Sequence, residues 1–337
     1  MLNPKTIPKK AKQPYDKDLW KLENLFLRKP GQHMIEIGQT GTGKTQGLYY
    51  ILEGLIKNSP ESTIVWIDTA KTSEILRLAT FRPLNLLIPE GCEIIIHPAE
   101  YIDPETGETK TYKFDIKTTK ILNYVDVWKS LDPNRINIIS FNRFVRGHIP
   151  HSKIVSRVFR KLIDVAYDYE IPVPLDIFID EFQFVCPARH MAKSPEHYSS
   201  GMDIIDSLFT MRSLKVRFIT ATQSWKVINV AARDSFPWMM IRRGAAFADG
   251  KLKRFNDLWE RVQEGYCWIV YPSRDYSDNT INLPFYGDGE ELGRVFYKGI
   301  LKVSRPKKKT EPEETEPEET EPEETEPEEW EDEKLGY

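Results

Sequence analysis

Three absences narrow the class of protein before any motif is considered. The 337 residues include only three cysteines, Cys92, Cys186 and Cys267, whose wide separation predicts neither a disulfide framework nor a zinc site. No run approaches the ~20 apolar residues needed to cross a bilayer. The amino terminus also lacks the apolar core of a signal peptide. With 40% hydrophobic residues, the chain is therefore expected to be a cytoplasmic globular protein with a full core.

Net charge is low, at −4, but it is divided unevenly along the chain. From Thr310 the sequence repeats Thr-Glu-Pro-Glu-Glu four times, and residues 310–337 carry fifteen acids and one lysine, a net charge of −14. The preceding 309 residues therefore carry +10. We expect 304–337 to be a disordered tail, because regular prolines and like charges prevent packing. Its role stays open between a solubilising segment and one that docks a protein partner or competes for a basic surface.

The strongest motif is a glycine loop between a predicted strand and a predicted helix. Residues 33–37 form an apolar run, and residues 45–56 have helical spacing of apolar side chains. The loop between them fits G-x-x-x-x-G-K-[ST] at Gly38, Gln39, Thr40, Gly41, Thr42, Gly43, Lys44 and Thr45. Such a loop aims backbone N–H groups and a helix N-terminus at one point, which suits the α- and β-phosphates of a nucleotide. Lys44 would reach the β- and γ-phosphates, and Thr45 would ligate Mg²⁺.

Two further strands end in polar residues that suit nucleotide hydrolysis. The apolar run 175–179 leads into Asp180 and Glu181, a Walker B arrangement in which Asp180 would hold Mg²⁺ and Glu181 would activate the attacking water. Strand 216–221 runs into Thr222 and Gln223. Because ligands lie at the carboxyl ends of strands in an open α/β sheet, Gln223 is expected beside the γ-phosphate.

These segments together resemble the FtsK–HerA superfamily of P-loop motor ATPases. That superfamily includes type IV coupling proteins, viral genome-packaging ATPases and zonula-occludens-toxin-like proteins. The resemblance covers roughly residues 33–272 and rests on the glycine loop, strand 64–68 leading into 69–71, the segment 179–181 with its two acids, Pro187 and the run 211–223. Strand 136–141 and helix 152–168 follow the family order. It implies a RecA-like P-loop core with a mainly parallel sheet flanked by helices.

The resemblance also implies a ring oligomer, expected to be a hexamer, in which a neighbouring subunit completes each site. Arg212 is the first choice for an arginine finger that acts in trans, with Arg217 and Arg233 as runners-up. Two departures from the family pattern stand out. Ser224 and Trp225 follow the T-Q pair where members often carry Arg-Pro, and the absence of a membrane segment favours the soluble branch, in the host cytoplasm if the chain is viral.

The basic balance of residues 1–309 fits a polyanion, because lysines and arginines that neutralise phosphates gain affinity by releasing counterions. Two clusters are candidates for contacts with double-stranded DNA without sequence specificity. The first comprises Arg135, Arg143, Arg146, His148, His151 and Lys153, and the second comprises Arg242, Arg243, Lys251, Lys253 and Arg254.

The predicted organisation is a basic disordered arm at 1–13, a P-loop ATPase domain at 14–303 and the tail at 304–337. Within the domain, 92–97 and 109–114 are expected to pair as a β-hairpin, which makes about 92–114 an insertion. Helices are expected at 18–27, from 72 onward and at 252–263, and strands at 63–68, 238–241 and 266–271.

The hypothesis from the sequence is an Mg-ATP-driven motor that translocates or packages double-stranded DNA. Two alternatives remain open. One is a morphogenesis or secretion ATPase that acts on protein, and the other is a nucleotide switch that turns over slowly. An intact Glu181 argues against the switch.

Overall fold

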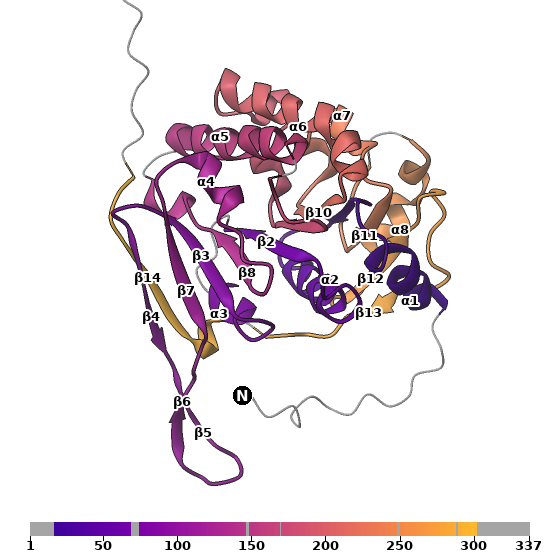
Figure 1. Cartoon of the computed structure of the whole chain (residues 1–337). Helices are drawn as coiled ribbons and strands as arrows, with labels where there is room; N and C mark the ends of the chain where they lie inside the picture. Colours follow the sequence, from indigo (N-terminus) through magenta and orange to yellow (C-terminus); the bar gives the residue numbers. More distant parts are fainter. Residues whose placement is uncertain are drawn as a thin grey trace, which may run out of the picture. The chain divides into compact units, whose positions relative to one another are not determined.

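A ten-stranded sheet organises the part of the chain that the computed structural model describes, namely residues 17–68, 74–145, 148–168, 170–247, 250–287 and 289–301 (Figure 1). Its order is β13-β12-β11-β1-β10-β9-β2-β8-β3-β7. The strands from β11 to β7 run parallel, while β12 and β13 add antiparallel pairs at one edge. In chain order the strands are β1 (Met34–Ile37), β2 (Thr63–Ile67), β3 (Leu84–Pro89), β7 (Ile116–Ile121), β8 (Ile136–Ile139), β9 (Leu175–Ile179), β10 (Val216–Thr222), β11 (Trp238–Ile241), β12 (Tyr266–Val270) and β13 (Ile281–Asn282).

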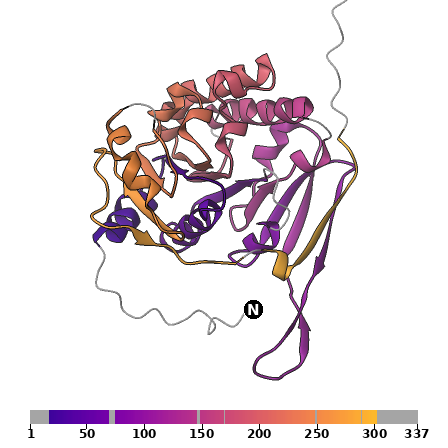
Figure 2. The ribbon, with the colours of Figure 1, turned by 180° about the vertical axis from the view of Figure 1, so that it is seen from behind.

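Helices cover both faces of this sheet and bury a separate apolar core on each (Figures 1 and 2). One face is covered by α4 (Tyr124–Lys129), α5 (His148–Tyr167), α6 (Pro195–Ser213), α7 (Val230–Arg233) and α8 (Asn256–Glu260). The other face is covered by α1 (Lys17–Lys21), the π-helical turn η2 (Leu22–Leu27), α2 (Lys44–Asn58) and α3 (Glu74–Leu78). The predicted fold class, a mainly parallel α/β sheet flanked by helices, is confirmed.

Alternation along the strands assigns side chains to the two cores, because successive residues of a strand point to opposite faces. In β1, Ile35 and Ile37 belong to the core under α5 and α6, whereas Met34 belongs to the core under α2. Across the α2 face, Trp66 of β2 stacks on Phe178 of β9 with ring centroids 5.3 Å apart and planes at 11°. Strands buried on both faces explain why the sequence shows continuous apolar runs there.

The predicted hairpin is only partly present. Strand β4 (Glu93–Pro98) pairs with β14 (Gly293–Lys298) and not with the 109–114 segment. A shorter hairpin joins β5 (Glu100–Ile102) to β6 (Thr109–Thr111), and both views show it extending away from the sheet (Figures 1 and 2). The predicted partner of β4 was wrong, because its actual partner lies almost two hundred residues later in the sequence, where no local pattern could indicate it.

Short 3-10 turns connect several of these elements. They are η3 (Asn142–Phe144), η4 (Phe182–Phe184), η5 (Arg189–Met191), η6 (Trp225–Val227), η7 (Lys251–Phe255) and η8 (Gly289–Leu292). The helix predicted at 252–263 is instead η7 followed by α8, and the ring of Phe255, where the two meet, lies 4.9 Å from that of Tyr276.

Several sequence predictions fall outside the described residues: the basic arm at 1–13, the segment 69–71 and the tail at 304–337. Among the helices that the structure describes, none combines the length and apolar character required to span a membrane.

Candidate nucleotide site

The glycine loop connects β1 to α2 in a backbone conformation that requires its glycines. Gly41 and Gly43 have φ of 81° and 86°, in the left-handed region that other residues rarely adopt. Gly38 has a different restriction, since a Cβ there would lie 2.4 Å from Cβ of Arg242. The three glycines therefore fit the loop for two distinct reasons, backbone conformation and close packing.

Hydrogen bonds tie the loop to the strands on both sides of β1. The N–H of Gly38 donates to the carbonyl of Thr222 at 3.3 Å, and the N–H of Gln39 donates to that of Arg243 at 3.1 Å. The ammonium of Lys44 is buried and donates to the carbonyls of Gly38 and Gln39, each at 3.0 Å. Lys44 thus curls back over the loop that precedes it.

A hydroxyl and a carboxylate converge beside the loop. The Oγ1 of Thr45, in the first turn of α2, donates to Oδ2 of Asp180 at 2.9 Å. Asp180 directly follows β9 and is fully buried. Hard oxygen donors of this kind suit Mg²⁺, which usually binds through one or two protein ligands together with substrate phosphates. The residues present therefore fit the predicted metal.

Glu181 lies next to this pair, with its carboxylate held by two side-chain amides. Nε2 of Gln223 donates to Oε1 at 2.9 Å, and Nε2 of Gln183 donates to Oε2. Glu181 has φ of 69°, so it occupies the left-handed region without being glycine. Gln183 was not singled out from the sequence, because a glutamine two residues after an acid carries no recognisable signal.

Sheet order brings these groups together. The strand that carries the loop, β1, neighbours β10, which in turn neighbours β9. All three run parallel, so their carboxyl ends meet at one edge, with the loop, Gln223 and the two acids side by side. Strands remote in sequence thus unite the residues that the motifs predicted.

A buried ion pair lies beneath the loop and was missed from the sequence. Nε of Arg242, just after β11, donates to Oε1 of Glu36 in β1, and both side chains are about 1% exposed. Burial, its largest cause, raises the pKa of Glu36 to about 7, against the opposing effect of Arg242. The prediction that Arg242 contacts DNA is wrong, since its guanidinium is enclosed. A glutamate inside the apolar run 33–37 was the only signal.

The arginine-finger candidates differ sharply in exposure. Arg212 is exposed in the last turn of α6, before the amino end of β10, whereas Gln223 follows the carboxyl end of that seven-residue strand. At about 3.3 Å per residue, some 20 Å separates them, so Arg212 does not serve the site of its own chain. Arg217 is buried against Asp176, and Arg233 is buried beneath Trp225, so neither runner-up can reach a neighbour.

Fewer residues of the two basic clusters are available for DNA contacts than the sequence predicted. In the first, Arg135 pairs with Asp115, and Arg143 pairs with the buried Asp68 at the carboxyl end of β2. Arg146 lies outside the described residues, and the side chains of His148, His151, Lys153 and Lys251 are not described. In the second cluster, Arg243, Lys253 and Arg254 are exposed.

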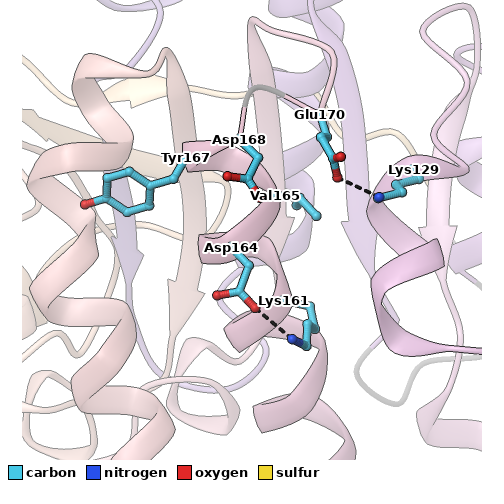
Figure 3. Close-up of a pocket in the computed structure, with 7 residues that line it drawn as sticks. All are labelled: Lys129, Lys161, Asp164, Val165, Tyr167, Asp168 and Glu170. Atoms are coloured by element: carbon cyan, nitrogen blue, oxygen red, sulfur yellow. Dashed lines mark hydrogen bonds and ion pairs between the residues drawn. The ribbon is translucent and has the colours of Figure 1, made fainter.

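A recess of about 610 Å³ lies elsewhere, at the carboxyl end of α5 (Figure 3). Four of its five charged side chains form two ion pairs: Lys129 with Glu170 at 2.6 Å, and Lys161 with Asp164 at 2.8 Å. Since α5 leads into the amino end of β9, this recess is at the opposite edge of the sheet from the glycine loop. It takes no part in the site.

Comparison of the sequence with protein-family models finds no match, and comparison with curated proteins finds none either. Comparison with solved structures does find matches. The genome-packaging NTPase B204 of Sulfolobus turreted icosahedral virus 2, in complex with AMPPCP, has 8% identity and a TM-score of 0.44 over 76% of this chain and 100% of its own.

Two other matched structures are the pCW3 conjugation coupling protein TcpA and the Thermomonospora curvata protein EccC. TcpA has 13% identity and a TM-score of 0.40, over 77% of this chain and 62% of its own. EccC has 13% identity and a TM-score of 0.38, over 77% and 37%.

Proposed function

We propose that the chain is an ATPase whose active site is the edge formed by β1, β10 and β9. The observation that carries the proposal is the convergence there of a glycine loop, the Thr45–Asp180 contact of 2.9 Å and the Glu181–Gln223 contact of 2.9 Å. Each contact joins residues from different motifs. A phosphate cradle, a pair of hard oxygen ligands and a carboxylate base are the three parts that nucleotide hydrolysis needs.

Lys44 is poised to exchange partners when phosphates enter the loop. Its present acceptors are two neutral carbonyls of the loop itself. Phosphate oxygens carry negative charge and carbonyl oxygens do not, so the ammonium of Lys44 is attracted more strongly to phosphates than to these carbonyls. Thr45 and Asp180 would hold Mg²⁺, which neutralises charge on the β- and γ-phosphates when bound.

Glu181 would accept a proton from the attacking water, and Gln223 would sense the γ-phosphate. Gln223 is exposed, so it can leave Glu181 for a ligand without disturbing the core. Arg212 is exposed and some 20 Å from its own site, which supports the prediction that it serves a neighbouring site in a ring, predicted to be a hexamer.

For the work that hydrolysis drives, we propose movement of double-stranded DNA without sequence specificity. The support is the +10 charge of residues 1–309 and the exposed Arg243, Lys253 and Arg254. Binding of this kind depends on phosphate neutralisation and weakens steeply with salt.

One observation favours the alternative of an ATPase that acts on protein. The β5–β6 hairpin extends from the sheet with Ile102 72% exposed and with the acids Glu100, Asp103, Glu105 and Glu108 around it (Figure 1). An acidic, partly apolar projection repels DNA and suits a protein surface.

The test measures steady-state ATP hydrolysis with and without duplex DNA, single strands and RNA at two salt concentrations. Lys44→Ala is expected to weaken ATP binding. Glu181→Gln should preserve binding and slow hydrolysis at least ~10²-fold, the lower range for a positioned base. Hydrolysis by Glu181→Gln at the wild-type rate would remove the assignment of Glu181 as the base. A hydrolysis rate that no nucleic acid changes would favour the protein-acting alternative.

The trans role of Arg212 has its own test. Arg212→Ala protein mixed with Glu181→Gln protein should regain activity, because a mixed ring can combine an intact finger with an intact site. No recovery in rings shown by light scattering to be mixed contradicts it.

The acidic tail can be tested by deletion of residues 310–337. If it competes with DNA for the basic surface, deletion tightens DNA binding, most at low salt. Unchanged affinity across a salt titration leaves docking of a protein partner or simple solubility.

A further inference from the structure

Both carboxylate oxygens of Glu181 are engaged by amides that come from different elements. Gln223 follows β10 and donates to Oε1, while Gln183 belongs to η4 and donates to Oε2. The two amides differ in surroundings, since Gln223 is exposed and Gln183 is half-buried. One oxygen is therefore held from the solvent side and the other from the protein side.

The second end of the Gln183 side chain is also fixed. Its Oε1 accepts a hydrogen bond at 3.1 Å from the hydroxyl of Thr222, the last residue of β10, which also lies 3.2 Å from the carbonyl of Ser224. Thr222 is fully buried, and its backbone carbonyl receives the N–H of Gly38 at 3.3 Å. A carboxylate only accepts hydrogen bonds, so the amide must turn its nitrogen to Glu181 and its oxygen to Thr222. Gln183 thus spans the gap between β9's catalytic end and β10.

The backbone around Glu181 keeps this arrangement in place. The left-handed conformation of Glu181 turns the chain sharply into η4. Phe182 is then completely buried, with its ring 5.3 Å from that of Phe236, and its carbonyl accepts the N–H groups of Val185 and Cys186 at 2.9 and 3.0 Å. A strained residue persists only where its surroundings hold it, and such residues gather at functional sites.

We infer that Gln183 is a positioning residue for hydrolysis: it fixes Oε2 of Glu181 from the protein side so that Oε1 is the oxygen that exchanges Gln223 for the attacking water. This inference rests on the proposed role of Glu181 as the base. In it the two amides have unequal parts, because Gln183 stays bonded to Thr222 throughout while Gln223 moves with the nucleotide. An oriented base loses rate when its supporting contact is removed, even though substrate binding is unaffected.

The experiment compares kcat, KM and the Kd for a non-hydrolysable ATP analogue in full-length protein. Gln183→Met keeps the length of the side chain and removes both hydrogen bonds. We expect kcat to fall about tenfold, a part of the ~10²–10⁴-fold that a positioned base contributes, with Kd within about twofold of wild type. Thr222→Val should reproduce part of this loss, and Thr222→Ser, the matched control that keeps the hydroxyl, should not.

A second arm separates positioning from mere support of the fold. In the Glu181→Gln background, adding Gln183→Met should cost nothing further in single-turnover rate, because the group it positions is already absent. An equal additional loss there, or a parallel weakening of analogue binding, would assign Gln183 a structural role and overturn the inference. If Gln183→Met fails to fold, the Thr222→Val and Thr222→Ser pair decides the question alone.

The two proposals fail differently. No ATP hydrolysis by the wild-type protein removes the proposed function, and wild-type hydrolysis by Glu181→Gln removes the role of Glu181 as the base. Slow hydrolysis by Glu181→Gln together with wild-type kcat in Gln183→Met removes only the positioning role.

Discussion

Two buried carboxylate–arginine pairs join neighbouring strands at opposite edges of the sheet, and they differ in how completely they are bonded. Asp176 and Arg217 are the second residues of β9 and β10, at the amino edge. Glu36 and Arg242 lie at the carboxyl end of β1 and just beyond β11, beneath the glycine loop. All four side chains are almost fully enclosed.

The pair at the amino edge has every charged atom engaged in the described contacts. Nε and Nη2 of Arg217 donate to the two oxygens of Asp176 at 2.6 and 3.0 Å, and Nη1 donates to the carbonyl of Phe26 at 2.7 Å. Ser62 donates a further bond to Asp176 at 2.6 Å. Because a buried ion pair offsets its desolvation only with such additional bonds, this one is built to hold the strands together.

The pair under the loop is less completely bonded. Among the described residues, Oε2 of Glu36 and Nη2 of Arg242 have no hydrogen-bond partner. Both atoms press against α2 at Gly47, where a Cβ would lie 2.4 Å from the carboxylate oxygens and 2.7 Å from Nη2. Arg242 also donates to the carbonyl of Thr42 at 3.4 Å. This pair therefore fits closely against the loop and α2, although two of its polar atoms lack hydrogen-bond partners among the described residues.

The difference indicates that the same kind of ion pair has two roles. Asp176–Arg217 stabilises the sheet at the amino ends of its strands, and Glu36–Arg242 supports the geometry of the glycine loop. A buried charge with incomplete bonding is costly and is kept where the surrounding structure needs its position. Variants at the two pairs should therefore respond differently.

The largest effect is expected for Arg217→Met, which leaves Asp176 as an unpaired buried charge. Breaking such a pair from one side costs about 3–5 kcal/mol in the free energy of unfolding. Urea titration measures it, with Arg212→Met, an exposed arginine at the same edge, as a control expected within about 0.5 kcal/mol of wild type.

Arg242→Met should cost less, about 1–3 kcal/mol, the penalty for an unsatisfied buried polar group. The pKa of Glu36 is raised to about 7, so near neutral pH this acid can take a proton when its partner is lost. The same titration at pH 6 checks it. A loss equal to that of Arg217→Met would break the comparison.

Gly47→Ala tests the close contact directly. Its Cβ would displace the Glu36–Arg242 pair, and overpacking of this kind costs about 1–3 kcal/mol, of which better helix propensity returns up to about 1 kcal/mol. The matched glycine is Gly201 in α6, whose Cβ would meet its nearest neighbours at 3.4 Å. Gly201→Ala should be neutral or stabilising in thermal unfolding, and equal outcomes for the two glycines would contradict the packing argument.

The smallest effect concerns how the free energy of unfolding depends on pH. It compares His33, just before β1, with Glu36, near the end of that strand. Burial lowers the pKa of His33 to about 4, and its Nδ1 accepts the N–H of Phe218 at 3.1 Å, so the folded state keeps this ring neutral. Between pH 4 and 6.5 His33 takes up a proton in the unfolded chain and stays neutral in the folded one. Its contribution to the free energy of unfolding therefore falls as the pH falls. Between pH 4.5 and 7 the folded chain retains a proton on Glu36 that the unfolded chain loses, so that contribution falls as pH rises.

In wild type these two dependences oppose each other between pH 4.5 and 6.5. Glu36→Gln should therefore make stability fall on acidification from pH 6.5 to 4, and His33→Gln should make it rise on acidification from pH 7 to 4.5. Each slope is at most about 1.4 kcal/mol per pH unit. Urea titrations across this range measure the slopes, and identical pH profiles for the two variants would refute the assignment.

Much of the candidate site could be predicted from the sequence because its motifs are local. The loop from Gly38 to Thr45 needs fixed residue types at fixed spacing between a strand and a helix, and Asp180 and Glu181 need only follow an apolar strand. Gln223 was found in the same way. The fold class followed from strands that alternate with helices.

Residues whose partners are distant could not be predicted from such patterns. Arg217, Arg242 and Arg143 have the same side-chain chemistry as exposed arginines, so sequence alone suggested surface roles for all three. The contact of Gln183 with Thr222 and the pairing of β4 with β14 also join segments that are distant in sequence.

The sequence by itself determined the nucleotide motifs, the alternation of strands and helices and the charge division between residues 1–309 and 310–337, because spacing and composition act along the chain. Only the tertiary structure decided which charges are enclosed, since burial depends on partners that the sheet order brings together. Glu36 and Arg242 are 206 residues apart in sequence and become neighbours because β1 and β11 pair side by side. Within one protein, therefore, spacing specified the chemistry of the site and strand pairing specified its support.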